Sequence, residues 1–314
     1  MKNSVESDTV DCLGMGIMPL DLLYSVKRLP LAGEKIDALD RTLQGGGPVP
    51  NALVGLSRLG LSTALIAVVG DDHMGRTLIA ELQREGVDHS LVVSKKRPTA
   101  VAIGLIELGS GRRTIVLHRR VFIGSRDVRT SACPIPRVVH LDGRDLEATM
   151  KLARWARRVG AAVSFDIGSV RNDVTPVLPL VDHLVVADAF AFSYTGARRA
   201  AAAIRRLADI CPGSIVVTEG LKGSTGLERE AGRTTGEMIR QPAFKVACVD
   251  ATGAGDSFHA GYLYGLLKGL DMAGRLEFGA AVAALKCRRS GARAGAPTLR
   301  QVMRFLRDNP RTYA

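Results

Sequence analysis

The sequence predicts an α/β protein in which a doubly wound, mostly parallel sheet carries helices on both faces and a small β-strand lid. Short apolar runs rich in β-branched residues alternate with amphipathic helical stretches along the chain. Continuous apolar strands of this kind are typical of parallel sheets buried on both faces. The predicted strands are residues 10–17, 62–69, 137–141, 161–166, 183–187 and 214–218.

The predicted helices lie between and after these strands. Gly60 and Gly86 are expected to end the first two, because glycine readily adopts the left-handed conformation that follows a helix. The C-terminal third is predicted to be mostly helical. The helical stretches are residues 51–59, 76–85, 146–159, 197–210, 254–268, 273–287 and 299–306.

Two stretches, residues 21–43 and 99–121, depart from this alternation. Both show shorter strands with turn signals, and the second has a hairpin signal at Gly109-Ser110-Gly111. Alternating polar and apolar residues indicate strands with one solvated face. Together the two stretches predict a discontinuous antiparallel lid.

Composition limits the class of protein. The chain has 314 residues, of which 46% are hydrophobic and 24% charged, as in an ordinary globular protein. The first nine residues lack a signal-peptide pattern, and no run approaches the roughly 20 apolar residues of a membrane helix. We therefore expect a cytoplasmic protein without membrane association. The five scattered cysteines predict neither a disulfide framework nor a structural zinc site.

The net charge of +12 suits an anionic partner. Aromatic residues make up only 4% of the chain, too few for a platform that stacks single-stranded bases. We expect no nucleic-acid partner, and a small anionic molecule such as a nucleotide explains the charge better.

The most informative segment is the run from Asp250 to Asp256, Asp-Ala-Thr-Gly-Ala-Gly-Asp, followed by an apolar helical pattern. Free amides at such a helix start favour negative charge. A carboxylate there can accept a hydroxyl proton beside a pocket for a phosphoryl group. The alternative is that Asp256 only complements the helix dipole, worth under about 1 kcal/mol. The chain has no P-loop and no complete dinucleotide fingerprint.

This run closely resembles the DTxGAGD signature of the ribokinase (PfkB) family of carbohydrate kinases. Three further segments resemble the family's other motifs in the expected order. They are Gly45-Gly-Gly-Pro-Val-Pro-Asn51, Gly70-Asp-Asp72 with Gly75, and Thr218-Glu-Gly-Leu-Lys-Gly223. The resemblance spans nearly the whole chain and implies one ribokinase-like kinase domain over residues 1–314, with the lid inserted at 21–43 and 99–121.

The resemblance also implies the reaction and the residues that perform it. ATP with Mg²⁺ is the implied donor, and Asp256 is the implied general base of an in-line transfer to a sugar hydroxyl. The amides of Gly253, Ala254 and Gly255 would form the anion hole. The implied acceptor-binding residues are Asp21, Gly46, Gly47 and Asn51. The implied nucleotide-binding residues are Thr218, Gly220, Gly223, Thr252, Ala280 and Ala284.

The sequence departs from the family pattern at the metal. The family's NxxE motif, which helps to hold Mg²⁺, is replaced by Ala187-Asp188-Ala189-Phe190, so Asp188 is expected to take part of that role. Many members bind a monovalent cation, and by resemblance K⁺ would meet Asp250, Thr252 and Ser290. Lid strands often pair between subunits in this family, which implies a homodimer.

The acceptor is the least determined feature. Segments 241–245, 283–287 and 291–295 resemble the branch of ketohexokinases and sulfofructose kinases, in which an arginine at about the place of Arg144 binds a sulfonate. Arg119 and Arg120 near the lid also favour an anionic sugar over a neutral one. The alternatives are a nucleoside kinase of the same family, disfavoured because Tyr24 and Phe122 are the only aromatic residues in or beside the lid, and a non-catalytic sugar or nucleotide sensor.

Overall fold

The structure is a computed structural model that describes residues 9–108 and 113–310. Its main sheet has the strand order β14-β13-β12-β11-β10-β9-β1-β4. Neighbouring strands are parallel from β4 to β12, and β13 and β14 are antiparallel, so the predicted mostly parallel sheet is confirmed. The strands are β1 (Thr9–Met15), β4 (Thr63–Ile66), β9 (Ile135–Leu141), β10 (Ala162–Ile167), β11 (His183–Ala187), β12 (Ser214–Thr218), β13 (Ser224–Glu230) and β14 (Arg233–Gln241).

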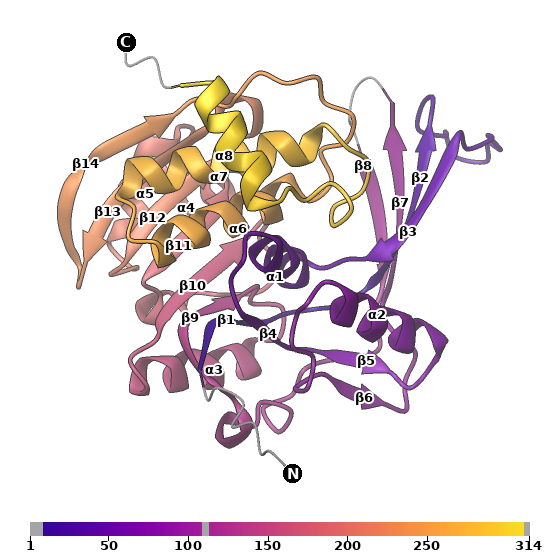
Figure 1. Ribbon diagram of the computed structural model, residues 1–314, viewed down its shortest axis with the longest axis horizontal. Coiled ribbons are helices and arrows are strands. Elements are labelled where there is room, and N and C mark those ends of the chain that lie inside the picture. Colours follow the sequence, from indigo (N-terminus) through magenta and orange to yellow (C-terminus); the bar gives the residue numbers. More distant parts are fainter. Residues whose placement is uncertain (1–8, 109–112, 311–314) are drawn as a thin grey trace.

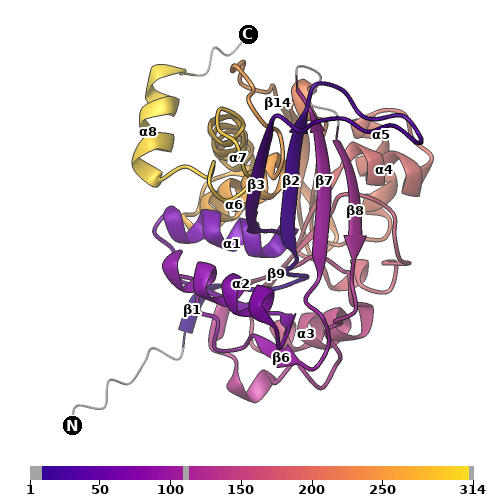
Figure 2. The ribbon, with the colours of Figure 1, turned by 90° about the vertical axis from the view of Figure 1, so that its right-hand side faces the viewer.

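Helices cover both faces of this sheet (Figures 1 and 2). Successive side chains of a strand point to opposite faces. Leu13 and Val139 accordingly belong to the core that includes residues of α3, while Cys12 and Val138 belong to the core that includes residues of α1 and α6. The helices are α1 (Pro48–Arg58), α2 (His73–Arg84), α3 (Leu146–Arg158), α4 (Asp188–Thr195), α5 (Ala200–Ala208), α6 (Ala254–Leu267), α7 (Met272–Cys287) and α8 (Leu299–Asp308).

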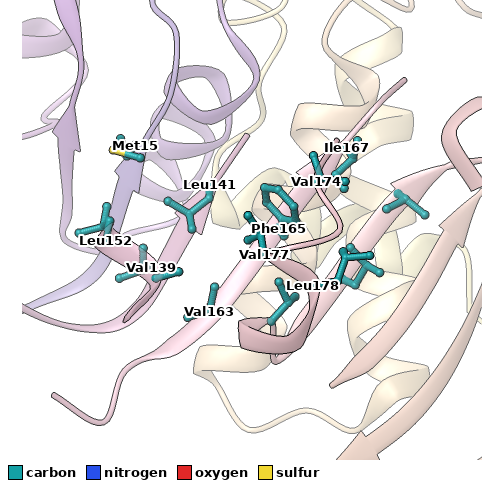
Figure 3. Close-up of a cluster of buried hydrophobic side chains, with 14 of the residues drawn as sticks. Met15, Val139, Leu141, Leu152, Val163, Phe165, Ile167, Val174, Val177 and Leu178 are labelled. Atoms are coloured by element: carbon teal, nitrogen blue, oxygen red, sulfur yellow. The ribbon is translucent and has the colours of Figure 1, made fainter. Parts of the chain in front are cut away.

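The first of these cores surrounds Phe165 on β10 (Figure 3). Leu141 and Ile167 are buried at the carboxyl ends of β9 and β10, so these two strand ends pack on the apolar core. None of the helices in the part of the chain that the structure describes is long and apolar enough to cross a membrane.

Three local expectations differ from the structure. The strand expected over residues 62–69 is divided into β4 and β5 (Val68–Gly70), and β5 pairs with β6 (Val93–Lys95) in a separate two-stranded sheet. Strands β13 and β14 were not expected. Most of β14 is exposed, so it lacks the apolar pattern by which the inner strands are recognised. Helix α4 and the short 3₁₀ helices at Thr130–Ala132, Leu178–Leu180 and Gly220–Lys222 were also not expected.

The two irregular stretches contribute two strands each to one separate sheet, in the order β3-β2-β7-β8. Figure 2 shows these four strands side by side in front of the main domain. They are β2 (Leu20–Val26), β3 (Asp40–Gly45), β7 (Val101–Glu107) and β8 (Arg113–His118). Strands β2 and β3 are antiparallel, as are β7 and β8, but β2 and β7 pair in parallel, so the expectation of a wholly antiparallel lid is wrong where the two stretches meet. The expected hairpin residues Gly109-Ser110-Gly111 lie outside the described residues. We call this sheet the lid sheet.

Candidate active site

Asp256 lies in the first turn of α6 and is half-buried. The helix begins after Gly253, whose φ of 75° is in the left-handed region. A Cβ on Gly253 would lie 2.5 Å from the Cβ of Ala292, so this turn requires glycine. Beside Gly255, by contrast, a Cβ would meet no heavy atom within 4 Å. Asp256 therefore stands at a helix start that has open space next to it.

The three amides expected to form an anion hole differ in their pairing. The Ala254 amide donates to the carbonyl of Ala251 at 3.1 Å and is already engaged. Among the described residues, the amides of Gly253 and Gly255 have no acceptor, and no side chain caps α6. These two amides are thus the ones available to an anion.

Asn51 fixes the position of the Asp256 carboxylate. Its Nδ2 donates to Asp256 Oδ2 at 2.7 Å, while its Oδ1 accepts from Arg293 Nε at 2.9 Å. The Arg293 guanidinium is only 1% exposed, and it also donates to the carbonyl of Gly46 at 3.0 Å and lies 3.3 Å from Glu81. Because Arg293 engages the amide oxygen, the Asn51 amide is held with its NH₂ group toward Asp256. Sequence reasoning did not assign a role to Arg293.

Asp21 joins this group from the lid sheet. It is the second residue of β2, and a Cβ on Gly46 would lie 2.1 Å from its Oδ1. Gly47 has φ 96°, and a Cβ there would lie 2.0 Å from the carbonyl oxygen of Ile17. The glycines therefore allow the lid and the start of α1 to approach closely. The structure brings together Asp21, Gly46, Gly47, Asn51 and Asp256, as expected from the resemblance.

The pKa values of the Asp256 and Asp21 carboxyl groups are both raised. Burial raises the pKa of Asp256 to about 6, helped by repulsion from Asp166 and opposed by the Asn51 hydrogen bond. Burial raises the pKa of Asp21 to about 7, where the charge of Arg293 opposes it and Asp256 and Glu81 add repulsion. A carboxyl with such a pKa binds a proton more strongly than an ordinary aspartate and suits general base catalysis near neutral pH.

Next to these residues, the ends of β9 and β10 form a pocket of about 100 Å³ that includes Arg144. In the described part of the chain the Arg144 guanidinium has no carboxylate within 4 Å, and burial lowers its pKa, as does the nearby Arg171. Among the described residues, the Arg171 guanidinium donates only to the Ser169 hydroxyl, at 2.9 Å. The lining residues are Pro48, Asp142, Gly143, Arg144, Asp166, Ile167, Gly168, Ser169, Arg171, Asn172 and Val174.

Two acidic residues, Asp142 and Asp166, also line this pocket. Asp142 accepts the amide of Ile17 at 2.9 Å, and burial raises its pKa to about 6. Asp166 Oδ1 lies 3.1 Å from His259 Nε2. Since Asp166 also repels Asp256, it links the pocket electrostatically to that carboxylate. Arg171, Asp142 and Asp166 were not singled out by sequence reasoning. Asp142 follows β9, Asp166 is the second-last residue of β10 and Arg171 lies in the loop after β10, so their place at the carboxyl ends of buried strands is the signal that could have found them.

One expected contribution to the pocket is absent. Arg119, which sequence reasoning placed near an anionic acceptor, forms an ion pair with Asp145, and its guanidinium lies 4.6 Å from the centre of the Phe122 ring. It is therefore engaged within the protein and not free for a ligand.

The expected nucleotide-binding residues lie on β12, in the turn after it, before α6 and on α7. Thr218 ends β12, Gly220 is exposed, and a Cβ on Gly223 would lie 2.0 Å from the carbonyl of Gln241. The Thr252 amide donates to Asp250 Oδ1 at 2.7 Å. Two further expected residues, Ala280 and Ala284, are buried in α7.

The residues expected at the metal sites lie at the start of α4 and in the loop after α7. Asp188 is the first residue of α4, where its Oδ1 accepts the amide of Ala189. Phe190 is fully buried and stacks on Tyr194, so this position belongs to the core. Ser290 is exposed in the loop after α7.

Comparisons with known proteins identify the family of the chain. Residues 10–299 match the pfkB family carbohydrate kinase profile. The chain is 24% identical to 5-dehydro-2-deoxygluconokinase of Geobacillus thermodenitrificans, covering 96% of this chain and 94% of the relative. It is 29% identical to ATP-dependent ribose-1-phosphate kinase of Halopiger xanaduensis, covering 95% and 99%.

The fold is shared with solved structures. An Escherichia coli protein described as ribokinase II, solved in complex with ATP and Mg²⁺, matches with a TM-score of 0.82 at 20% identity, covering 95% of this chain and 99% of the other. The match over nearly the full length, in sequence and in fold, shows that the chain belongs to the pfkB family of carbohydrate kinases and is an ATP-dependent sugar kinase.

Proposed function

We propose that the protein transfers the γ-phosphoryl group of ATP to a hydroxyl of a sugar that carries an anionic group, with Asp256 as the general base. The observation that carries this proposal is the pair of guanidinium groups, Arg144 and Arg171, in a pocket that shares Asp166 with the surroundings of Asp256. Guanidinium groups without a carboxylate partner are suited to a carboxylate, sulfonate or phosphate. Two relatives are named for anionic sugars, 5-dehydro-2-deoxygluconate and ribose 1-phosphate.

The chemistry follows from the groups around Asp256. The carboxylate accepts the proton of the attacking hydroxyl, and Asn51, held by Arg293, keeps the carboxylate in place. The amides of Gly253 and Gly255 at the start of α6 stabilise the negative charge on the transferring phosphoryl group. Asp21 accepts hydrogen bonds from acceptor hydroxyls beside Gly46 and positions the sugar for in-line attack.

Kinases of this family use ATP and Mg²⁺, and the carboxylates at the strand ends fit the ion. Ala187 and Thr218 are partners on the parallel strands β11 and β12. Asp188 and Glu219 directly follow these two residues, so their backbones lie next to each other at the carboxyl ends of β11 and β12. Carboxylate oxygens are ligands that suit Mg²⁺. When bound, the ion neutralises charge on the phosphates. We assign the nucleotide to Thr218, Gly220, Gly223 and Thr252, with the adenine toward Ala280 and Ala284.

The outer face of the lid sheet supports a homodimer. Leu43, Leu22, Ile103 and Val116 are successive register partners across all four strands, so their side chains form one apolar row. Leu43, Ile103 and Val116 are exposed, Val116 by 66%. A second copy of the lid would cover this row. Light scattering should report a dimer that Val116→Lys converts to a monomer.

A nucleoside acceptor is less compatible with the lid. Successive side chains of β2 point to opposite faces, so Tyr24 lies on the outer face with Leu22 and not on the face of Asp21. Within the described residues, no aromatic side chain of the lid sheet is on the face of Asp21.

An acceptor screen tests the proposal. ATP consumption should be measured with sugar acids, sulfosugars, phosphosugars, neutral ketoses and nucleosides under the same conditions. The expected result is the highest kcat/KM with one of the anionic sugars. A neutral ketose or a nucleoside as the best acceptor would show that the two arginines do not select the substrate.

A further inference from the structure

Lys286 places a buried positive charge under the turn that leads to Asp256. The side chain is 0% exposed, and its Nζ donates to the carbonyl oxygen of Asp250 at 2.5 Å. The same ammonium lies 3.7 Å from Asp250 Oδ2. Two oxygens of Asp250, its main-chain carbonyl oxygen and its carboxylate Oδ2, thus lie next to the ammonium.

Asp250 is itself the anchor of the turn. Its Oδ1 accepts the amide of Thr252 at 2.7 Å, and its Oδ2 accepts the amide of Gly291 at 2.8 Å. The amides of Val249 and Asp250 both donate to the carbonyl of Cys287, at 2.8 and 3.2 Å. The end of α7 and the loop after it therefore fix the chain at Asp250, three residues before Gly253.

The packing around Lys286 leaves little space. A Cβ on Gly295 would lie 3.1 Å from Lys286 Cε and 2.9 Å from the Lys286 carbonyl oxygen. Burial raises the pKa of Asp250, but the charge of Lys286 and the hydrogen bonds outweigh it, so the net shift is downward and the carboxylate stays ionised. The ammonium and the carboxylate thus neutralise each other inside the protein.

Asp250 is one of the residues that the family resemblance assigns to a monovalent cation. The residues present do not fit K⁺ at that place, because the Lys286 ammonium already contacts the carbonyl and the carboxylate of Asp250. A second cation beside it would face a like charge in a buried site. Of the other two expected ligands, Thr252 is buried and donates its amide to Asp250 Oδ1, while Ser290 is exposed.

We propose that the Lys286 ammonium is a covalently attached substitute for the monovalent cation, which holds the anion-binding turn at Gly253 and makes the enzyme independent of K⁺. This assigns Lys286 as a positioning residue, and its effect on turnover rests on the proposed kinase reaction. The ammonium organises the carbonyl and carboxylate of Asp250 as a bound ion would, without a concentration requirement.

The first test needs no variant. The thermal midpoint and kcat of the wild-type protein should be compared in KCl, NaCl and tetramethylammonium chloride at equal ionic strength. We expect kcat to differ by less than about twofold and the midpoint to be unchanged between the salts. Activation by K⁺ of about tenfold or more, or a midpoint raised by K⁺ alone, would overturn the proposal.

The second test removes the ammonium with Lys286→Met, using Lys96→Met at an exposed lysine as the matched control. In tetramethylammonium chloride, Lys286→Met should lower kcat by about 10- to 100-fold, because the turn loses its anchor. KCl should restore part of the activity and raise the thermal midpoint of this variant only. Full activity without K⁺, or no response of either readout to K⁺, would show that Lys286 does not replace a cation.

The thermal readout separates this inference from the proposed acceptor. It requires neither sugar nor ATP, so a failed acceptor screen leaves it intact. If Lys286→Met does not fold, the salt comparison on the wild-type protein still decides the question.

Discussion

The two sides of the acceptor site differ in how their charged groups are paired. Around Asp256, Asn51 donates to the carboxylate, and Arg293 contacts both Asn51 and Glu81. At the ends of β9 and β10, Arg144 and Arg171 have no carboxylate partner among the described residues and line an open pocket. Groups that perform the chemistry are fixed before the substrate arrives, whereas groups that recognise the variable part of the substrate remain available to it.

The largest expected effect removes the base. Asp256→Asn keeps the shape of the side chain but cannot accept the hydroxyl proton, so kcat should fall by about 10²–10⁴-fold. ATP affinity should change little, because the amides of the turn are unaltered. The measurement is steady-state kinetics together with calorimetric titration of ATP, and a kcat within a few-fold of wild type would refute the assignment of the base.

The next largest effect is expected on stability, when the ion pair between Arg293 and Glu81 near Asp256 is broken. Arg293→Met leaves Glu81 without its cation in a buried place, so the free energy of unfolding should fall by about 3–5 kcal/mol. Chemical denaturation followed by circular dichroism measures it. As a control, Arg304→Met removes an exposed i,i+4 pair with Asp308 and should change stability by less than about 0.5 kcal/mol. Equal losses in the two variants would contradict the contrast.

Substitution of Arg144 or Arg171 should weaken recognition of the acceptor and leave the stability of the fold unchanged. Arg144→Met and Arg171→Met should each lower kcat/KM for the anionic acceptor by about 10- to 100-fold, as expected for the loss of a charge-assisted hydrogen bond. Their unfolding free energies should match wild type within about 1 kcal/mol, and neutral sugars should be little affected. A uniform loss with all acceptors would mean that the arginines support the fold and not recognition.

The smallest effect within the working range is the pH dependence. Asp256 acts as a base only when ionised, and its pKa is raised to about 6. Therefore kcat should rise with pH and level off above about 6, falling about tenfold per unit below it. Weakening the repulsion from Asp166 with Asp166→Asn should move this midpoint to lower pH. Because Asp166 also lines the pocket, the midpoint and not the rate is the informative readout; an unchanged midpoint would exclude the electrostatic link.

The main sheet and most helices were predictable because local patterns determine them. Strands β11 and β12 have the predicted bounds, since each is a short apolar run between turn signals. Strand β14 was missed because most of its residues are exposed, and exposure removes the pattern on which prediction depends.

The site was predictable where a motif carries it and not where distant residues meet. Asp256 and its glycines stand out in the sequence. The role of Arg293 depends on Asn51, 242 residues away, so no local signal reveals that this guanidinium is buried. Its neighbours in Gly291-Ala-Arg293-Ala-Gly295 are small, which allows a large side chain to enter the core, but this composition also fits an ordinary loop.

Strand β2 carries Asp21 and Leu22 next to each other, one beside Gly46 and the other in the apolar row of the outer face. Because their backbone is shared, whatever restrains the outer surface also restrains the carboxylate proposed to position the sugar. The proposed subunit association would thereby be coupled to acceptor affinity through a single peptide unit, and dilution of the enzyme should raise the apparent KM for the sugar while leaving that for ATP unchanged.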